Sequence, residues 1–287
     1  MVVTGGVCVK IILSRKGFDS TYGGYPSIIY KNGYMQSFPI PNLLDSIRYS
    51  DIYCKAANDS LYNVMKAIRP KIHSKTWIDL SEESTCHLDP DIDFFSIPRK
   101  EGWVGCFGQG AASQSVLKNS LVGEGDIFLF FGWFNIIRLE ELGRLEFENS
   151  SGIHAIYGYL QVDKVIYTAN DEIPSWLQYH PHVNKRHLDK PNNCIYIAKD
   201  FCTWNKKRRG YGVFNYTEEL RLTKEGLSRS KWCLPDIFKN VNITYHSKDS
   251  WKDGYFQAAH RGQEFVVDAT VAIQNWAIEL IERNARE

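Results

Sequence analysis

The chain of 287 residues carries 34 Lys and Arg against 33 Asp and Glu, a formal net charge of +1. This balance argues against a protein that coats duplex nucleic acid with a strongly basic face, although it leaves room for a local basic groove. The seven cysteines are odd in number and form no Cys-x-x-Cys pair, so neither a disulfide framework nor a zinc ribbon is indicated. No apolar run reaches the roughly 18 residues that a membrane helix needs. We therefore expect a cytoplasmic protein with no membrane partner.

The first third of the chain predicts short strands and one helix. An apolar, β-branched run at residues 9–13 predicts a strand that ends in a polar loop. Asn32-Gly33 between two apolar runs is the strongest short signal for a β-hairpin. Residues 58–69 predict a helix with one apolar face, begun by a cap at Asn58 or Asp59.

The remainder is rich in strands and ends in a helix with one apolar stripe. Strands are expected at 103–107, 127–134, 153–166 and 194–198, and helices at 111–117 and 265–283. No linker or repeat interrupts the chain. We expect a mixed α/β (α+β), β-rich protein with an extension at residues 1–9 and one domain over residues 10–287.

A polar loop follows the first predicted strand, with the sequence Ser-Arg-Lys-Gly-Phe-Asp-Ser at residues 14–20. Arg15 can hold a phosphate with two parallel hydrogen bonds, and Lys16 can act as a point charge beside it. Ser20 offers a hydroxyl to a ligand, and Asp19 is a candidate catalytic carboxylate. A surface loop with solvated charges is an equally good interpretation.

A second motif is His87-Leu88-Asp89-Pro90-Asp91. In an extended segment, alternate side chains share a face, so the histidine and both carboxylates are expected on one side. They could bind a metal ion or divide the work of a general acid and a general base. The His-x-Asp spacing matches two ligands of iron(II) oxygenases, and the sequence does not select a third ligand. The structural alternative is a turn in which the carboxylates bond local backbone.

Two further motifs carry amides and charges. Gly-Gln-Gly-Ala-Ala-Ser-Gln at residues 108–114 places Gln109 and Gln114 where they could read the edge of a base, unless it is only a glycine-rich turn. In His-Arg-Gly-Gln-Glu at residues 260–264, Arg261 could reach into a site. Gln263 and Glu264 could act there as ligand-binding and catalytic groups, or cap the final helix.

The sequence Gly-Asp-Ile-Phe-Leu-Phe-Phe-Gly-Trp-Phe at 125–134, followed by a strand of the form Gly-x-Leu-x-Val at 158–162, is similar to the small β-barrels of the PUA-like group. The similarity implies a barrel subdomain over about residues 103–199, in which Trp133 and Tyr159 could stack on a base. Packing in the core is the alternative for both side chains. The basic run at residues 206–209 is most simply a solvated loop.

The five motifs at residues 14–20, 87–91, 108–112, 125–134 and 261–266 together resemble one bacterial family, the nucleotide modification associated domain 3 family. The resemblance covers the chain from Lys10 onward. It implies a link to modified DNA bases, since the family occurs among DNA-modification and phage-related genes. It implies no particular reaction, cofactor or catalytic residue.

Three hypotheses follow. The first is an enzyme acting on a nucleotide or a DNA base, with phosphate held by Arg15 and Lys16 and chemistry at the 87–91 motif. The second is a non-catalytic reader of modified bases with an aromatic cage. The third is a metal-dependent oxidoreductase or hydrolase that uses His87 and Asp89. A nucleotide or DNA is the expected ligand, and no protein partner is indicated.

Overall fold

The computed structural model describes residues 9–139 and 144–286, so the expected N-terminal extension lies outside the described residues except for Val9. The fold is mixed α+β, built on a strongly curled half-barrel sheet. The main path of this sheet, in spatial order, is β18 (Glu264–Val267), β1 (Ile11–Arg15), β10 (Ile127–Leu139), β12 (Ile153–Tyr167), β13 (Cys194–Ala198) and β9 (Cys106–Gln109). Further strands of the sheet are β3 (Ser27–Ile29), β4 (Met35–Gln36), β11 (Leu145–Phe147) and β14 (Tyr211–Val213).

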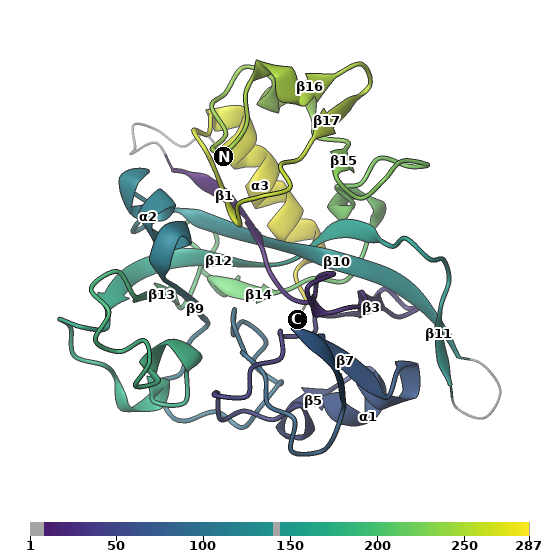
Figure 1. Cartoon of the computed structure of the whole chain (residues 1–287). Helices are drawn as coiled ribbons and strands as arrows, with labels where there is room; N and C mark the ends of the chain where they lie inside the picture. Colours follow the sequence, from purple (N-terminus) through teal and green to yellow (C-terminus); the bar gives the residue numbers. More distant parts are fainter. Residues whose placement is uncertain (1–8, 140–143, 287) are drawn as a thin grey trace.

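The two long strands β10 and β12 pair antiparallel and run across the whole molecule (Figure 1). On one side lie α3 (Val271–Asn284) and a small sheet of β15 (Lys231–Trp232), β17 (Tyr255–Gln257) and β16 (Trp251–Lys252). On the other lie α1 (Leu61–Ile68), the pair β5 (Tyr53–Cys54) and β6 (Asp59–Ser60), and the sheet of β2 (Tyr22–Gly23), β7 (Lys71–Ser74) and β8 (Thr76–Asp79). A further helix, α2 (Ala111–Asn119), follows β9. None of the helices in the described ranges is long and apolar enough to cross a membrane.

The expected strands and the hairpin are present, although the strand expected at 103–107 begins only at Cys106 and runs to Gln109. The strands β3 and β4 pair antiparallel around Asn32-Gly33, and Gly33 has the positive φ of 82° that this turn requires. The half-barrel also takes β1, β3, β14 and β18 from outside residues 103–199, so a separate barrel subdomain over that range stays a prediction.

Two helix boundaries differ from expectation. Helix α1 is capped by the Ser60 hydroxyl, which accepts the backbone N–H of Asn63, rather than by the two residues before it. The prediction of one helix over 265–283 is wrong at its start, because residues 264–267 form β18, which pairs antiparallel with β1. The true helix begins after Thr270, whose hydroxyl accepts the N–H of Ile273. Gln263 and Glu264 therefore do not cap it.

The loop of the first motif leaves the sheet at a gap along one edge of β10. The first half of β10 pairs in parallel with β1 and its second half pairs in parallel with β3. At this gap the N–H of Lys16 donates to the carbonyl of Phe131 at 2.8 Å. A Cβ on Gly132 would lie 2.6 Å from the Lys16 carbonyl oxygen, so only glycine allows the loop to cross so closely.

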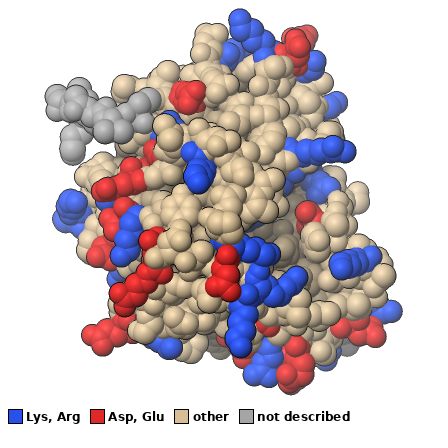
Figure 2. All heavy atoms as spheres, turned by 60° about the vertical axis from the view of Figure 1, so that its left-hand side comes forward, with Lys and Arg blue, Asp and Glu red and all other residues tan. Residues whose placement is uncertain are grey.

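The surface reflects the even charge balance of the chain. On the face shown in Figure 2, acidic and basic side chains are interspersed over much of the area, and several Lys and Arg side chains gather beside a hollow near its centre. An even overall charge is thus compatible with a local cluster of basic side chains.

Candidate active site

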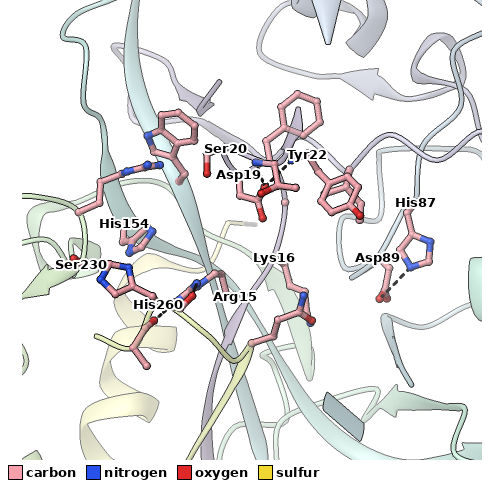
Figure 3. Close-up of a pocket in the computed structure, with 18 of the residues that line it drawn as sticks. Arg15, Lys16, Asp19, Ser20, Tyr22, His87, Asp89, His154, Ser230 and His260 are labelled. Carbon is pink, nitrogen blue, oxygen red and sulfur yellow. Dashed lines mark hydrogen bonds and ion pairs between the residues drawn. The ribbon is translucent and has the colours of Figure 1, made fainter. Parts of the chain in front are cut away.

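A cavity of about 540 Å³ lies where the loop of the first motif leaves the sheet. Its walls come from segments far apart in the sequence, and the expected site residues among them are Arg15, Lys16, Asp19, Ser20, His87, Asp89, Gln109, Trp133 and Gln263. His154, His182 and Arg229 line it as well, and sequence reasoning did not select them. In Figure 3, His87 and Asp89 lie on one side of the pocket, and Arg15, His154 and His260 lie on the other.

The segment that carries His87 and Asp89 is held in place by its backbone. The N–H of His87 donates to the carbonyl of Ile40 at 2.8 Å. Asp91 and Cys106 exchange two backbone hydrogen bonds of 2.9 Å, which tie the end of the motif to the start of β9. The two site residues are thus fixed between a loop and the sheet.

His87, Asp89 and His182 form a cluster that could hold a metal ion. One ligand atom from each lies within 4.8 Å of the other two. The Nε2 atoms of His87 and His182 are 4.0 Å and 3.9 Å from Oδ2 of Asp89. His182, on the short 3-10 helix Pro181–Val183, is the candidate third ligand that the sequence did not select.

The tautomer of His87 is set by a carboxylate behind it. Its Nδ1 lies 2.7 Å from Oδ2 of Asp45, and that oxygen also accepts the Asn42 amide at 2.7 Å. A carboxylate can only accept, so Nδ1 carries a proton, and Nε2 is the ring nitrogen that faces Asp89. A histidine held by a carboxylate in this way is typical of metal ligands.

His182 is oriented in the same way by a buried amide. Its Nδ1 lies 2.6 Å from Oδ1 of Asn193. The Asn193 amide nitrogen donates to the carbonyl of His182 and to the hydroxyl of Thr168, which identifies Oδ1 as the acceptor. The Nε2 lone pair of His182 therefore points at the cluster. Burial lowers the pKa of His182 to about 3, so the ring is neutral and able to bind a metal near pH 7.

Asp89 is held ionised between these rings. Burial acts to raise its pKa, but the side-chain hydrogen bond from His180, the largest of the opposing effects, helps to outweigh burial, and the pKa is lowered to about 2. Its Oδ1 accepts the N–H of Gly108 at 2.8 Å and lies 3.4 Å from Nε2 of His180. That nitrogen carries the proton, because the Nδ1 of His180 accepts the backbone N–H of His182.

Two imidazole nitrogens and one carboxylate oxygen form the donor set of non-haem iron(II) sites and of catalytic zinc sites. Both kinds of site leave coordination positions open for substrate. The cluster faces a cavity of ligand size, which meets that requirement.

The other side of the cavity carries a neutral histidine and two arginines. Trp232 Nε1, which can only donate, lies 3.1 Å from Nδ1 of His154, so the proton of that ring sits on Nε2. Burial, followed by the charges of Arg15 and Arg229, lowers the pKa of His154 to about 3. His154 therefore presents an uncharged N–H donor near neutral pH.

Lys16 lines the cavity, but its positive charge is neutralised by an ion pair with Glu264. Its Nζ lies 2.7 Å from Oε1 of Glu264, which is completely buried. The same oxygen accepts the side-chain amide of Gln109 at 2.7 Å. Glu264 thus lies behind the wall of the cavity and fixes two residues that line it.

Three expected site residues lie elsewhere. Asp91 is buried against the guanidinium of Arg99, with N–O distances of 2.6 and 2.7 Å. Gln114 is fully buried and accepts the hydroxyl of Tyr196 at 3.1 Å. Arg261 is exposed and is not among the residues that line the cavity.

The expected aromatic pair is not brought together. Trp133 lines the cavity, whereas Tyr159 lies on β12 opposite Leu129, four residues before Trp133 on β10, and is stacked on Phe214. Tyr159 borders a different hollow, together with Lys207, Arg208 and Arg209 of the basic run.

Fold and site together define an α+β protein in which a candidate metal cluster and two arginines line one pocket beside a half-barrel sheet. Comparison with known families agrees with the resemblance seen in the motifs. The profile of the family described as nucleotide modification associated domain 3 matches residues 10–268, and the chain belongs to this family. The matched range contains every residue that lines the cavity. Neither the curated proteins nor the solved structures give a significant match.

Proposed function

We propose that this protein is a metal-dependent enzyme that modifies a nucleotide or a base in DNA. The observation that carries the proposal is the cluster of His87, Asp89 and His182, whose ligand atoms lie within 4.8 Å of one another. The family description links the chain to nucleotide modification, which supports the substrate class.

The hydrogen bonds behind the ligands support a metal site over a packing arrangement. Asp45 and Asn193 each accept an Nδ1 proton, so both rings turn their Nε2 atoms toward Asp89. The three atoms converge on one point at the cavity wall, where a divalent ion would be coordinated by all three.

Acid–base catalysis by Asp89 alone is the weaker alternative. An effective general acid or base has a pKa near the working pH. The pKa of Asp89, about 2, keeps it ionised and weakly basic at neutral pH, which suits a metal ligand better. The chemistry supplied at such a site is the activation of water by zinc, or of oxygen by iron(II). The identity of the ion therefore decides between hydrolysis and oxidation.

A reader of modified bases needs an accessible aromatic cage. The Arg229 guanidinium lies 3.7 Å from the centre of the Trp133 ring, and Tyr159 is only 1% exposed. The two rings do not enclose a common space, so the geometry favours an enzyme.

The test incubates the protein with deoxynucleotides and with DNA, after loading it separately with Zn²⁺ and with Fe²⁺, the latter under oxygen with a two-electron reductant. Products are analysed as nucleosides by mass spectrometry. A new nucleoside mass or a released fragment is expected with wild type and absent with Asp89→Asn. Equal product from both proteins would refute the assignment of the cluster.

A further inference from the structure

Arg15 enters the cavity with its charge unmatched by any direct carboxylate contact in the described ranges. Its two terminal nitrogens donate to the carbonyl oxygens of His260 at 3.1 Å and Ala259 at 2.7 Å. These neutral acceptors orient the guanidinium but do not cancel its charge. The Nε atom of Arg15 is buried and has no hydrogen-bond partner among the described residues.

Arg229 reaches the same cavity from the loop before β15. Its guanidinium stacks on Trp133 at 3.7 Å from the ring centre. The indole is itself fixed, because its Nε1 donates to the carbonyl of Ser151 at 2.9 Å. Within the described parts of the chain, the guanidinium of Arg229 makes no hydrogen bond or ion pair. The stack therefore holds a set of N–H donors in place without using them.

The charges at this end of the cavity do not balance. Asp19 is the carboxylate whose charge acts on both arginines, and one of its oxygens already accepts the N–H groups of Thr21 and Tyr22. Two guanidinium charges against one carboxylate leave one positive charge. Burial lowers the pKa of both arginines, which reflects the cost of keeping these charges away from water. An anion from outside the protein would offset that cost.

Resting on the proposed function, we propose that Arg15 and Arg229 form a subsite for a phosphate group of the substrate, so that the base extends toward His87, Asp89 and His182. The planar guanidinium suits two phosphate oxygens at once. The neutral Nε2–H of His154 offers a further donor on the same side of the cavity. A cavity of about 540 Å³ is within the range that accommodates a nucleotide. Lys16 has no such role, since Glu264 already neutralises it.

The test measures binding to metal-free protein, prepared with a chelator, so that phosphate cannot bind through a metal. Calorimetry compares the four deoxynucleoside 5′-monophosphates with the four deoxynucleosides. We expect at least one monophosphate to bind about 10-fold or more tightly than its nucleoside, an increment of about 1.4 kcal/mol or more. Arg229→Gln is expected to remove the difference, and Arg283→Gln, on the outer face of α3, to leave it unchanged. Equal binding of every pair by the wild type, or a preference that survives Arg229→Gln, would overturn the proposal.

Two further binding measurements distinguish a failure of this inference from a failure of the proposed function. Asp89→Asn is expected to keep the preference for monophosphates, because the phosphate subsite does not use the metal cluster. Loss of the preference in that variant, with the fold intact by circular dichroism, would contradict the two-part site. An oligonucleotide that binds metal-free protein more tightly than any monophosphate would identify DNA as the source of the phosphate, and weaker binding would identify a free nucleotide.

Discussion

Asp89 and Asp91 are two residues apart, yet their carboxylates serve different partners. Asp89 lies among His87, His180 and His182 on the cavity wall, while Asp91 is 1% exposed and bound by both terminal nitrogens of Arg99. Arg99 in turn lies 3.8 Å from the ring centre of Trp103. One carboxylate is available to a metal ion, and the other holds the adjacent loop to the core.

These different partners predict that two matched substitutions affect different properties, metal affinity in one case and folding stability in the other. Asp89→Asn is expected to lower metal affinity by more than the roughly 10–100-fold typical of losing an outer-shell partner, because it alters a ligand itself. Asp91→Asn is expected to lower the free energy of unfolding by about 3–5 kcal/mol, because it leaves the buried charge of Arg99 unpaired. Metal titration and urea unfolding of both variants check this. Unchanged metal affinity in Asp89→Asn would refute the role given to that residue.

The absence of a side chain at Gly108 leaves room for the ring of His182. A Cβ at this position would lie 2.4 Å from the His182 ring and 2.8 Å from the His180 ring. Gly108→Ala should therefore displace His182 and reduce metal affinity by about 10-fold or more, in line with disturbance of ligand orientation.

Gly110→Ala is the control for that substitution. Its added Cβ would meet nothing closer than Asn193 Oδ1 at 3.5 Å, which is an ordinary contact. Metal affinity of this variant is expected to match the wild type. If both alanine variants bound metal as wild type does, His182 would not be a ligand in this arrangement.

Asp45 is expected to act on the metal through His87. Asp45→Asn weakens the acceptor that holds the Nδ1 proton of His87, and we expect a loss of about 10–100-fold in metal affinity. Asp51→Asn, which alters an exposed pair with Arg48, should change affinity little. Competition with a chromophoric chelator measures both values, and equal affinities in the two variants would contradict the carboxylate–histidine arrangement.

His154 should make the protein less stable in acid. Its pKa in the folded chain, about 3, lies below the ordinary value of 6.5. The stability from keeping the ring neutral is fully present above pH 6.5 and is lost as the pH falls from 6.5 toward 3. At pH 5 the loss attributable to this ring is about 1–2 kcal/mol.

Urea unfolding at pH 7 and pH 5 tests this contribution. His154→Asn retains an oxygen that can accept from Trp232 in place of Nδ1 but cannot take up a proton. The fall in stability between the two pH values should be smaller in the variant by that amount. An identical fall in both proteins would show that His154 does not resist protonation.

Local patterns predicted much of the fold. Asn32-Gly33 specifies a turn by its own backbone preference, and the apolar run at 127–134 has the composition of a strand buried on both faces. The start of the C-terminal helix was predicted wrongly because Phe265 and Ala269 fit helical spacing. In the structure, residues 264–267 instead pair with β1 as a strand of the sheet. Short apolar runs do not distinguish a buried strand from a helix without that long-range partner.

The residues of the candidate site were likewise predicted only in part from the sequence. Arg15, His87 and Asp89 stand in dense polar motifs, which made them visible in the sequence. His182 lies in the His-Pro-His segment at residues 180–182, on a short 3-10 helix, and Arg229 lies in a loop, and only folding brings them to the cavity. Their roles depend on contacts with residues elsewhere in the sequence. His182 bonds Asn193, 11 residues later, and Arg229 stacks on Trp133, 96 residues earlier.

The most direct test of the account is titration of the metal-free protein with Co²⁺, followed by its visible absorption spectrum. We expect one equivalent to bind per chain with bands of nitrogen and oxygen coordination, and we expect Asp89→Asn and His182→Gln to abolish that spectrum while remaining folded. Absence of stoichiometric binding by the wild type, or an unchanged spectrum in both variants, would contradict a metal centre at His87, Asp89 and His182.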